Sequence, residues 1–385
     1  MTPKKRESRK PSNVAIAREV AFDVLRRVAS GAYASDLLFQ ATAGLDSRDA
    51  GLAGEITLGV LRRQAQLDWL ISRQAKRPVS KLDVEVAIAL RMALHQIYFL
   101  DRVPVYAAVN DSLNLLRGAR KVSAIAFANA VLRQAGKKTR LPDLAVPEWL
   151  LNKWTVDFGA ETAEAIAHAS LETPHLYQRV PAGCPPPENA KRTEIDGCWE
   201  VENPDPRFRI QDIGSQSIVP LLELQPQGRF LDVCSAPGNK TAQAAEVALR
   251  IVACDISHAR LQTLRLPVPR VLLDATRPLP FAAKFDKILV DAPCSGTGTL
   301  GHNPEIKWRL KPEQLQGFAE RQGLILRNAL EALAPNGTLV YSTCSLEKEE
   351  NEDVARAVAG GRIIGEIRRF PGRDPGDGFY AAVIR

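Results

Sequence analysis

Two short motifs, fifty residues apart, carry side chains that can do chemistry. Asp291 and Cys294 belong to an Asp-Ala-Pro-Cys sequence, and Cys344 is the centre of a Thr-Cys-Ser sequence at 343–345. Each motif follows an apolar run typical of a buried strand, residues 288–290 and 338–341. In an open α/β sheet, ligands bind at the carboxyl ends of the strands. The two cysteines are therefore predicted to share one pocket.

The surroundings of these cysteines favour reactivity. A cysteine attacks as the thiolate, which a helix amino terminus or a nearby cation stabilises. Cys344 lies between a strand and a helix predicted to begin at 346–347, which suits a nucleophile. Cys294 is followed by Ser-Gly-Thr-Gly, whose glycines allow the backbone to approach a ligand closely. The remaining cysteines form no C-x-x-C pair and are predicted to be inert or packing residues: Cys184, Cys198, Cys234 and Cys254.

A second polar set surrounds a predicted strand-to-helix turn. Residues 231–241 contain a strand, a tight Pro-Gly turn and the start of a helix, whose free N–H groups can receive an anionic group. The turn lacks the G-x-G-x-x-G fingerprint of NAD-binding proteins. Asp255 and Asp274 follow the next two strands, where carboxylates can accept from ribose hydroxyls and from the amine of adenine. Singly, an Asp after a strand is usually a cap or turn residue, but together these positions predict a pocket for a nucleoside-type cofactor.

Alternating strands and helices must position these groups. From residue 229 the pattern predicts a mainly parallel sheet. Its seven strands are predicted at 230–233, 251–254, 270–273, 287–290, 338–342, about 363–368 and 379–384. Helices are predicted to begin near 239, 257, 312 and 347. A seventh strand at the end matches the class I methyltransferase arrangement, so residues 229–385 are predicted to form a Rossmann-like α/β domain.

The preceding residues divide into three further parts. Residues 1–12 read as a basic disordered tail, and 13–140 as an all-α domain of six or seven helices. Prolines recur through 141–228 and interrupt long helices. This part is predicted to be a small connecting α+β subdomain, with helices near 148–153 and 160–171 and strands near 176–180 and 198–201.

The charge is distributed unevenly. The 385 residues carry a net charge of +7, yet residues 1–140 hold 24 Lys and Arg against 12 Asp and Glu. The amino-terminal part is therefore predicted to dock a polyanion; solvated basic faces without a partner are the alternative. No apolar run reaches the ~18 residues of a transmembrane helix, and the first residues lack the apolar stretch of a secretory signal. We expect a cytoplasmic protein, monomeric and without a metal.

Several segments resemble known families. Residues 58–62, 66–69 and 127–133 resemble the NusB-like RNA-binding domain, although a helical bundle used for protein contact stays an alternative. Residues 232–241, 291–299, 303–308 and 337–351 resemble RNA cytosine-5 methyltransferases of the Nop/Sun type, and 371–372 with 377–380 fit the closing motif of that family. The order of the two domains is similar to that of bacterial 16S ribosomal RNA cytosine-5 methyltransferases. The resemblance covers nearly the whole chain.

This resemblance implies a reaction and a site. It implies S-adenosylmethionine as cofactor and ribosomal RNA as partner, with Cys344 attacking C6 of cytosine, Cys294 assisting product release and Asp291 holding the base. The implied cofactor-binding residues are Cys234, Ser235, Ala236, Pro237, Gly238, Asn239, Lys240, Asp255, Asp274 and Asp291. Addition at C6 makes C5 nucleophilic, which is the purpose of the attacking thiolate.

The sequence departs from the family pattern at one position, and other substrates and functions stay as alternatives. The family usually has Pro-Gly-Gly-Lys where this chain has Asn239 in the third position, so Asn239 is expected to tolerate a positive φ there. Transfer RNA is the alternative substrate, and an inactive ribosome assembly factor is an alternative function. Retention of both cysteines and Asp291 speaks against inactivity. In DNA cytosine methylation Cys294 would attack, and Cys344 would have no explanation.

Overall fold

The computed structural model describes residues 14–134, 139–143 and 145–385, and their contacts form two compact units. The described part of residues 1–147 together with His302–Glu305 makes the first unit, and Glu148–Gly301 with Ile306–Arg385 makes the second. The predicted basic tail, 1–12, lies outside the described residues. The four-part division with boundaries after residues 12, 140 and 228 stays a prediction.

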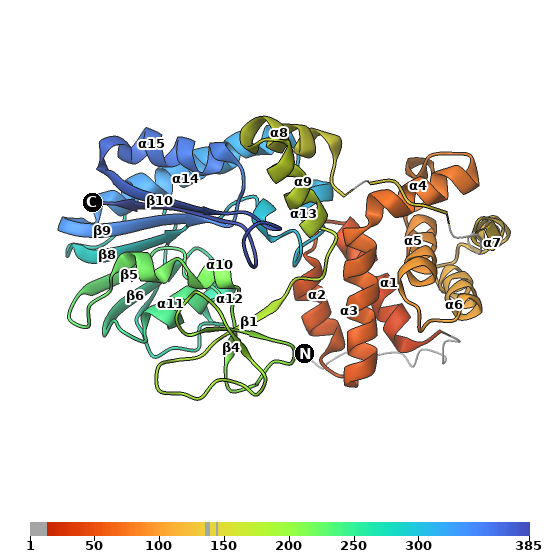
Figure 1. Ribbon diagram of the computed structural model, residues 1–385, viewed down its shortest axis with the longest axis horizontal. Helices are drawn as coiled ribbons and strands as arrows, with labels where there is room; N and C mark the ends of the chain where they lie inside the picture. Colours follow the sequence, from red (N-terminus) through yellow and green to blue (C-terminus); the bar gives the residue numbers. More distant parts are fainter. Residues whose placement is uncertain (1–13, 135–138, 144) are drawn as a thin grey trace, which may run out of the picture. The chain divides into compact units, whose positions relative to one another are not determined.

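The first unit is helical, as predicted (Figure 1). Its α-helices are α1 (Ile16–Ala29), α2 (Ala34–Thr42), α3 (Ser47–Arg62), α4 (Gln64–Ala75), α5 (Val84–Phe99), α6 (Val105–Gly118) and α7 (Ile125–Arg133). Helix α5 is buried almost continuously from Val86 to Ile97 and contacts α1, α3, α4, α6 and α7. A helix that is apolar on all sides belongs at the centre of a bundle. Helices α1, α3, α4, α6 and α7 pack against it, whereas α2 packs on α1 and α3.

A short segment of the later sequence belongs to this unit. Residues His302–Glu305 group with the helices, and the N–H of Ala34 donates to Oε1 of Glu305 at 2.8 Å. Glu305 is 1 % exposed, so this bond is protected from water. The donor lies in the first turn of α2, where N–H groups lack a partner within the helix.

A seven-stranded sheet forms the centre of the second unit (Figure 1). Its strands are β5 (Arg229–Asp232), β6 (Arg250–Asp255), β7 (Arg270–Leu272), β8 (Phe285–Asp291), β9 (Leu333–Thr343), β10 (Ile363–Arg369) and β11 (Phe379–Ile384). They lie in the order β10-β11-β9-β8-β5-β6-β7. Neighbours from β7 to β9 pair in parallel, whereas β11 runs antiparallel to both β9 and β10. The predicted Rossmann-like sheet is confirmed.

Side chains of the central strands β5 and β8 alternate between two cores. Leu231, Ile288 and Val290 face one apolar cluster together with α14 (Pro312–Glu331) and α15 (Glu352–Ala359). Phe230 and Leu289 face the other cluster, with η4 (Val219–Leu222) and α11 (Asn239–Ala244). Burial on both faces explains why these strands are continuous apolar runs. The carboxyl ends of the strands are thereby left for polar residues.

Residues 148–216 contribute two helices, a small sheet and a short helix to the second unit. Helices α8 (Glu148–Phe158) and α9 (Ala160–Ala169) lie where they were predicted, although α8 ends five residues later than expected. The antiparallel sheet orders its strands β2-β3-β1-β4. These are β1 (Leu176–Arg179), β2 (Lys191–Arg192), β3 (Cys198–Val201) and β4 (Arg209–Ile210), and α10 (Ile213–Gln216) follows them. Trp154 of α8 is fully buried, and its burial explains why the helix continues past residue 153.

One predicted helix start is wrong. The helix expected at 346–347 begins only at Glu352, after the single 3-10 turn η6 (Lys348–Glu350). Residues 345–351 are held by side-chain hydrogen bonds instead of a helical ladder: Thr343 donates to Asn351, and Asn351 donates to the carbonyl of Ser345. Ser and Asn side chains compete with helical bonds in this way. Helix α12 (His258–Leu261) begins next to the predicted position 257 and spans only four residues.

Candidate active site

The two motif cysteines meet at the carboxyl ends of β8 and β9. The parallel register pairs Asp291 with Ser342, so the residues that follow each strand emerge side by side. The sulfurs of Cys294 and Cys344 lie 3.4 Å apart, and both side chains are partly buried. The structure thus brings together the two thiols that the sequence placed in one pocket.

Several hydrogen bonds join the loops that carry these thiols. Ala292 donates its N–H to the carbonyl of Ser342 at 2.8 Å, and Gly298 donates to the carbonyl of Cys344 at 2.8 Å. The hydroxyls of Ser295 and Ser345 are 3.0 Å apart, and Leu346 donates its N–H to Oγ1 of Thr297 at 2.9 Å. The two loops therefore form one connected backbone support.

Gly298 allows three backbone segments to approach one another. A Cβ at this position would lie 2.3 Å from the carbonyl oxygen of Gly378 and 2.8 Å from that of Cys344. Both contacts are with backbone, which cannot turn aside as a flexible side chain can. This close approach explains the glycine in the sequence after Cys294.

Asp291 is fixed beside the cysteines by two donors. Lys240 Nζ lies 2.8 Å from Oδ2 of Asp291, and Ser342 Oγ donates to Oδ1 at 2.9 Å. The Lys240 ammonium also lies 4.9 Å from the centre of the Phe379 ring, a cation–π contact. The side chain of Asp291 is still 30 % exposed, so it remains accessible to a ligand. Lys240 thus links the turn after β5 to the carboxylate that precedes Cys294.

The turn after β5 has the shape expected of a ligand-binding turn. Gly238 has a φ of 110°, and a Cβ there would meet Leu264 Cδ1 at 2.1 Å. Arg260 donates to the carbonyl of Ala236 at 2.5 Å. The expected positive φ at Asn239 is wrong, because Gly238 takes that conformation and Asn239 begins α11. Asn239 can therefore replace glycine without backbone strain.

The acidic residues after β6 and β7 are held by their own loops. Asp255 accepts from the N–H of Ala236 at 3.2 Å and from that of Ser257 at 2.8 Å. Asp274 accepts from the N–H and hydroxyl of Thr276, and these bonds lower the pKa of Asp274. Parallel pairing of β5, β6 and β7 puts both residues at the edge that carries the Gly238 turn.

Two buried polar atoms next to this turn have no hydrogen-bond partner within the described residues. They are Oγ of Ser235 and Oδ1 of Asp232. Asp232 also accepts from Thr241 at 2.6 Å, and burial raises its pKa to about 7. Buried polar groups are normally paired, so these atoms are free to take part in binding. The carboxylates, free hydroxyl and glycine turn fit a nucleoside with hydroxyl and amine groups.

The thiols differ in how tightly they hold their protons. The hydrogen bond with Cys344, together with burial, raises the pKa of Cys294 well above its ordinary value. Burial likewise raises the pKa of Cys234 and Cys254. Buried thiols with raised pKa values are poor nucleophiles. The thiols of Cys234 and Cys254 are therefore structural. Of these two residues, only Cys234 lies in the turn for which we predict cofactor binding.

A group of buried polar residues that the sequence did not reveal supports the Cys344 loop. Glu347 accepts from the indole N–H of Trp154 at 3.1 Å, and burial raises the pKa of Glu347 to about 7. Glu350 is 0 % exposed and accepts from Ser345 Oγ at 2.7 Å. Acidic residues in a Glu-Lys-Glu-Glu-Asn run resemble an exposed helix start, so no signal in the single sequence marked them as buried.

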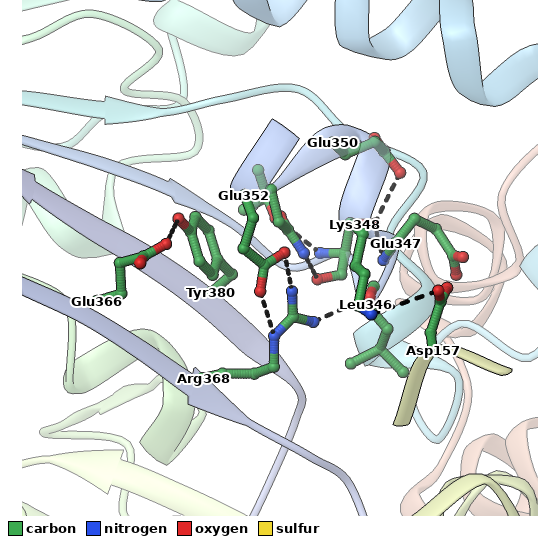
Figure 2. A network of polar contacts seen from close by, with 12 residues as sticks. Asp157, Leu346, Glu347, Lys348, Glu350, Glu352, Glu366, Arg368 and Tyr380 are labelled. Carbon is green, nitrogen blue, oxygen red and sulfur yellow. Dashed lines mark hydrogen bonds and ion pairs between the residues drawn. The ribbon is translucent and has the colours of Figure 1, made fainter. Parts of the chain in front are cut away.

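Arg368 completes the support from β10. Its guanidinium pairs with Glu352 and donates to the carbonyl of Leu346 at 2.9 Å (Figure 2). It also stacks near the rings of Phe158, Phe370 and Tyr380. Lys348 lies 3.5 Å from Asp157 of α8, which ties the same loop to the helix on its other side.

Neither a metal cluster nor a membrane span is found in the part of the chain that the structure describes. Its residues contain no group of three or more His, Cys, Asp or Glu that could hold a metal ion. Of the described helices, none combines the length and apolar character that crossing a membrane requires.

Comparison with known proteins connects both units to named families. The family described as 16S rRNA methyltransferase RsmB/F matches residues 219–385, and the NusB family matches residues 15–137. Ribosomal RNA small subunit methyltransferase B of Xylella fastidiosa strain Temecula1 is 30 % identical over 393 residues, covering 88 % of this chain and 90 % of that protein. The protein of the same name from strain 9a5c is 31 % identical and covers 88 % and 93 %.

Solved structures share the fold. The structure of PH0851 has a TM-score of 0.81 at 20 % identity and covers 98 % of this chain and 100 % of its own. NSun6 from Pyrococcus horikoshii, solved with SFG, has a TM-score of 0.54 at 20 % identity and covers 62 % and 98 %. Because relatives at 30 % identity and above are matched over nearly their whole length, the chain belongs to the 16S rRNA methyltransferase RsmB/F family, a family of RNA methyltransferases.

Proposed function

We propose that this protein methylates C5 of a cytosine in 16S-type ribosomal RNA, with S-adenosylmethionine as cofactor and a covalent bond between Cys344 and C6 of the base. The observation that supports this most is the pair of thiols, 3.4 Å apart, beside Asp291 at the ends of adjacent parallel strands. A single thiol would be enough for attack. A second thiol at hydrogen-bond distance is available for a separate role in product release.

The cofactor would be held by residues 234–240, Asp255, Asp274 and Asp291. When bound, S-adenosylmethionine supplies an electrophilic methyl group. Asp255 and Asp274 offer carboxylate oxygens suited to hydroxyl and amine donors, and Ser235 offers a buried hydroxyl without a partner among the described residues. Lys240 holds Asp291 on the side of the cysteines, so the cofactor turn and the base-binding carboxylate are mechanically linked.

The thiols divide the chemistry between them. Since the pKa of Cys294 is raised, Cys294 keeps its proton and can donate a hydrogen bond to the sulfur of Cys344. The sulfur of Cys344 attacks C6 and makes C5 nucleophilic. After methylation, water takes the C5 proton, the C5–H electron pair forms the C5=C6 double bond, and the C6–S bond breaks with its electron pair returning to Cys344. The S–H of Cys294 is positioned to stabilise this departing thiolate.

Asp291 is proposed to hold the base. With Lys240 and Ser342 fixing its two oxygens, the carboxylate has a defined orientation and needs little reorganisation when substrate binds. A hydrogen bond at N3 would offset charge that develops on the ring. A cytosine within a helix must leave the stack to reach this pocket, so we expect single-stranded or locally opened RNA.

The NusB family domain is proposed to dock the RNA. Residues 1–140 carry twice as many basic as acidic residues, and such an excess attracts the phosphate backbone without reading sequence. We place this activity in the cytoplasm and expect a monomer that needs no metal.

Labelled cofactor tests the proposal. Purified protein is incubated with labelled S-adenosylmethionine and separately with ribosomal RNA, transfer RNA or DNA, and 5-methylcytosine is mapped. We expect label in ribosomal RNA, abolished by Cys344→Ala. We expect Cys294→Ala to accumulate a covalent RNA–protein adduct on denaturing gels.

Other outcomes would contradict particular parts. Label in transfer RNA alone would overturn the substrate, and no label in any nucleic acid would favour the inactive assembly factor. Full activity of Cys344→Ala with an inactive Cys294→Ala would reverse the two roles. The matched control is Cys198→Ala, because Cys198 is a buried thiol of β3 that belongs to neither loop.

A further inference from the structure

The carboxylate of Glu350 contacts both loops that carry the catalytic thiols. Oε2 of Glu350 accepts from the N–H of Ser295 at 2.9 Å, directly after Cys294. Oε1 accepts from Oγ of Ser345 at 2.7 Å, directly after Cys344. The residue next to each thiol is therefore tied to one oxygen of the same carboxylate.

A third element secures this carboxylate. Gln322 of α14 donates to Oε2 of Glu350 at 2.9 Å and also to the carbonyl of Pro293 at 2.9 Å. The backbone carbonyl of Glu350 accepts from the hydroxyl of Tyr341, a fully buried residue of β9. We call Glu350, Gln322, Ser295 and Ser345 the Glu350 cluster. Its members come from both loops and from the long helix behind them.

Burial makes this arrangement costly unless it is complete. Glu350, Gln322 and Ser345 are each 0 % exposed, and a buried carboxylate without donors is strongly unfavourable. Three donors satisfy Glu350, so the loops can separate only by leaving a buried oxygen unpaired. The carboxylate thereby resists any increase in the distance between Ser295 and Ser345, and with it the distance between the neighbouring sulfurs.

We infer that Glu350 is a positioning residue that holds the Cys294 and Cys344 thiols at working distance for adduct formation and release. The inference rests on the proposed function for its consequence, whereas the geometry it asserts can be measured without any methylation. The hydrogen bonds of the Glu350 carboxylate go to Ser295, Ser345 and Gln322 and not to the sulfurs, although its charge also helps to raise the pKa of Cys294. Its role is to fix the two peptides from which the thiols project.

The direct test measures how fast the two thiols can be joined. The full-length protein is treated with diamide, which accepts two electrons and two protons as Cys294 and Cys344 form a disulfide. The rate of that disulfide is followed by mass mapping of the unreduced peptides. Because thiol–disulfide chemistry depends on access and alignment of the sulfurs, we expect Glu350→Ala to slow it by about tenfold.

Two further variants separate the effect of side-chain shape at position 350 from a general effect on folding. Glu350→Gln keeps the length of the side chain. The carbonyl oxygen of the introduced amide can accept from Ser295 and Gln322, and its N–H can donate to Ser345. The hydroxyl of Ser345 can then turn to the hydroxyl of Ser295, 3.0 Å away. We expect it to stay within about threefold of the wild-type rate. Glu366→Gln is the matched control, because Glu366 accepts from Tyr380 and touches neither thiol loop.

Activity supplies a second measurement. For Glu350→Ala we expect kcat to fall by about tenfold or more while KM for RNA stays within about twofold, since binding surfaces are unchanged and only the thiol alignment is lost. If Glu350→Ala does not fold, Gln322→Met removes two bonds of the cluster, retains the volume, and is expected to slow the disulfide by about threefold. A disulfide rate that both Glu350→Ala and Gln322→Met leave at the wild-type value would overturn the inference. Slowed disulfide formation in a protein that methylates nothing would uphold the geometry and reject the proposed function instead.

Discussion

At the scale of single residues, two buried glutamates in the Cys344 loop are held in different ways. Glu350 receives three hydrogen bonds from both thiol loops and α14. Glu347 accepts from Trp154 and interacts with Thr297, and its second oxygen lies 3.8 Å from Lys153. Poorer compensation of the charge at Glu347 agrees with a pKa raised to about 7, for which burial is the main cause.

This raised pKa predicts a stability that depends on pH. The folded protein holds the Glu347 proton up to a pKa of about 7, whereas an unfolded glutamate releases it near 4.5. The stabilisation is complete below pH 4.5 and is lost as pH rises through 7, and its size is at most roughly 3 kcal/mol. We expect Glu347→Gln, which mimics the protonated form, to lose less stability than wild type between pH 5 and pH 8.

Urea unfolding at both pH values measures this difference. Subtracting the variant from wild type removes the contribution of Asp232, whose pKa is also raised to about 7 by burial and which is present in both proteins. If the free energy of unfolding changed equally from pH 5 to pH 8 in wild type and in Glu347→Gln, the assignment of the raised pKa to Glu347 would be contradicted. Glu366→Gln, at a partly exposed carboxylate of β10, serves as the control that should leave the pH dependence unchanged.

The convergence of the candidate site residues could be predicted from the sequence, but their buried supports could not. Asp291, Cys294 and Cys344 each follow an apolar strand, so strand ends alone predict their convergence. Glu350 and Gln322 are separated by 28 positions and meet only through packing of α14 on the sheet. The residues that flank Glu350 and Gln322 in the sequence are polar and typical of helices, and exposed residues have the same kind of neighbours. Such partners become visible only when tertiary contacts are known.

At the scale of elements, the strands were predictable and the short connections were not. Continuous apolar runs gave all seven strands of the large sheet within a few residues. The start of α15 was displaced because Thr343, Ser345 and Asn351 use side-chain bonds where a helix would use backbone bonds. The loops after β8 and β9 therefore depend on side-chain packing and close backbone approach rather than on local propensity.

Gly298 provides a test of that packing. Gly298→Ala puts a Cβ against the carbonyl oxygens of Gly378 and Cys344, and both backbones must move. We expect a loss of about 1–3 kcal/mol of stability, typical of overpacking, together with a reduction in methyl transfer of about tenfold. Thermal unfolding and initial rates of methylation measure the two effects.

Gly317 is the matched control for this substitution. It lies on the exposed side of α14, and nothing lies within 4 Å of an added Cβ. Gly317→Ala should raise stability by roughly 0.5–1 kcal/mol because alanine favours the helix, and activity should not change. Equal behaviour of the two alanine variants would show that the approach at Gly298 has no functional importance.

At the scale of the whole molecule, charge composition predicted the binding role of the helical part, and motifs after strands predicted that of the sheet. The helical part carries the basic excess, and the sheet carries the thiols and the carboxylates. The assignment of His302–Glu305 to the helical unit could not be predicted, because those residues continue the sequence of the catalytic motifs. Composition indicates what each part binds, whereas membership of a compact unit depends on contacts.

The basic excess predicts how RNA binding depends on salt. Arg73, Lys76 and Lys81 are exposed within nine residues at the end of α4 and in the 3-10 turn that follows it, η1 (Val79–Lys81). Each phosphate contact contributes about 0.7–0.9 to the slope of log K against log salt. If all three bind phosphates, replacing them with glutamine should lower that slope by about 2 and weaken binding at low salt without changing which RNA is preferred.

Filter binding or fluorescence anisotropy across salt concentrations measures the slope. The control replaces three exposed basic residues of the second unit, Lys191, Arg192 and Arg250, with glutamine and removes the same charge. If the helical unit docks the RNA, the slope of log K against log salt must fall much more in the first variant than in the control. Equal losses would show that net charge alone sets the affinity, and an unchanged slope in both would mean that neither set touches phosphates. Either result would reject the helical unit's role in docking through these residues, while leaving the thiol chemistry of the sheet to its own tests.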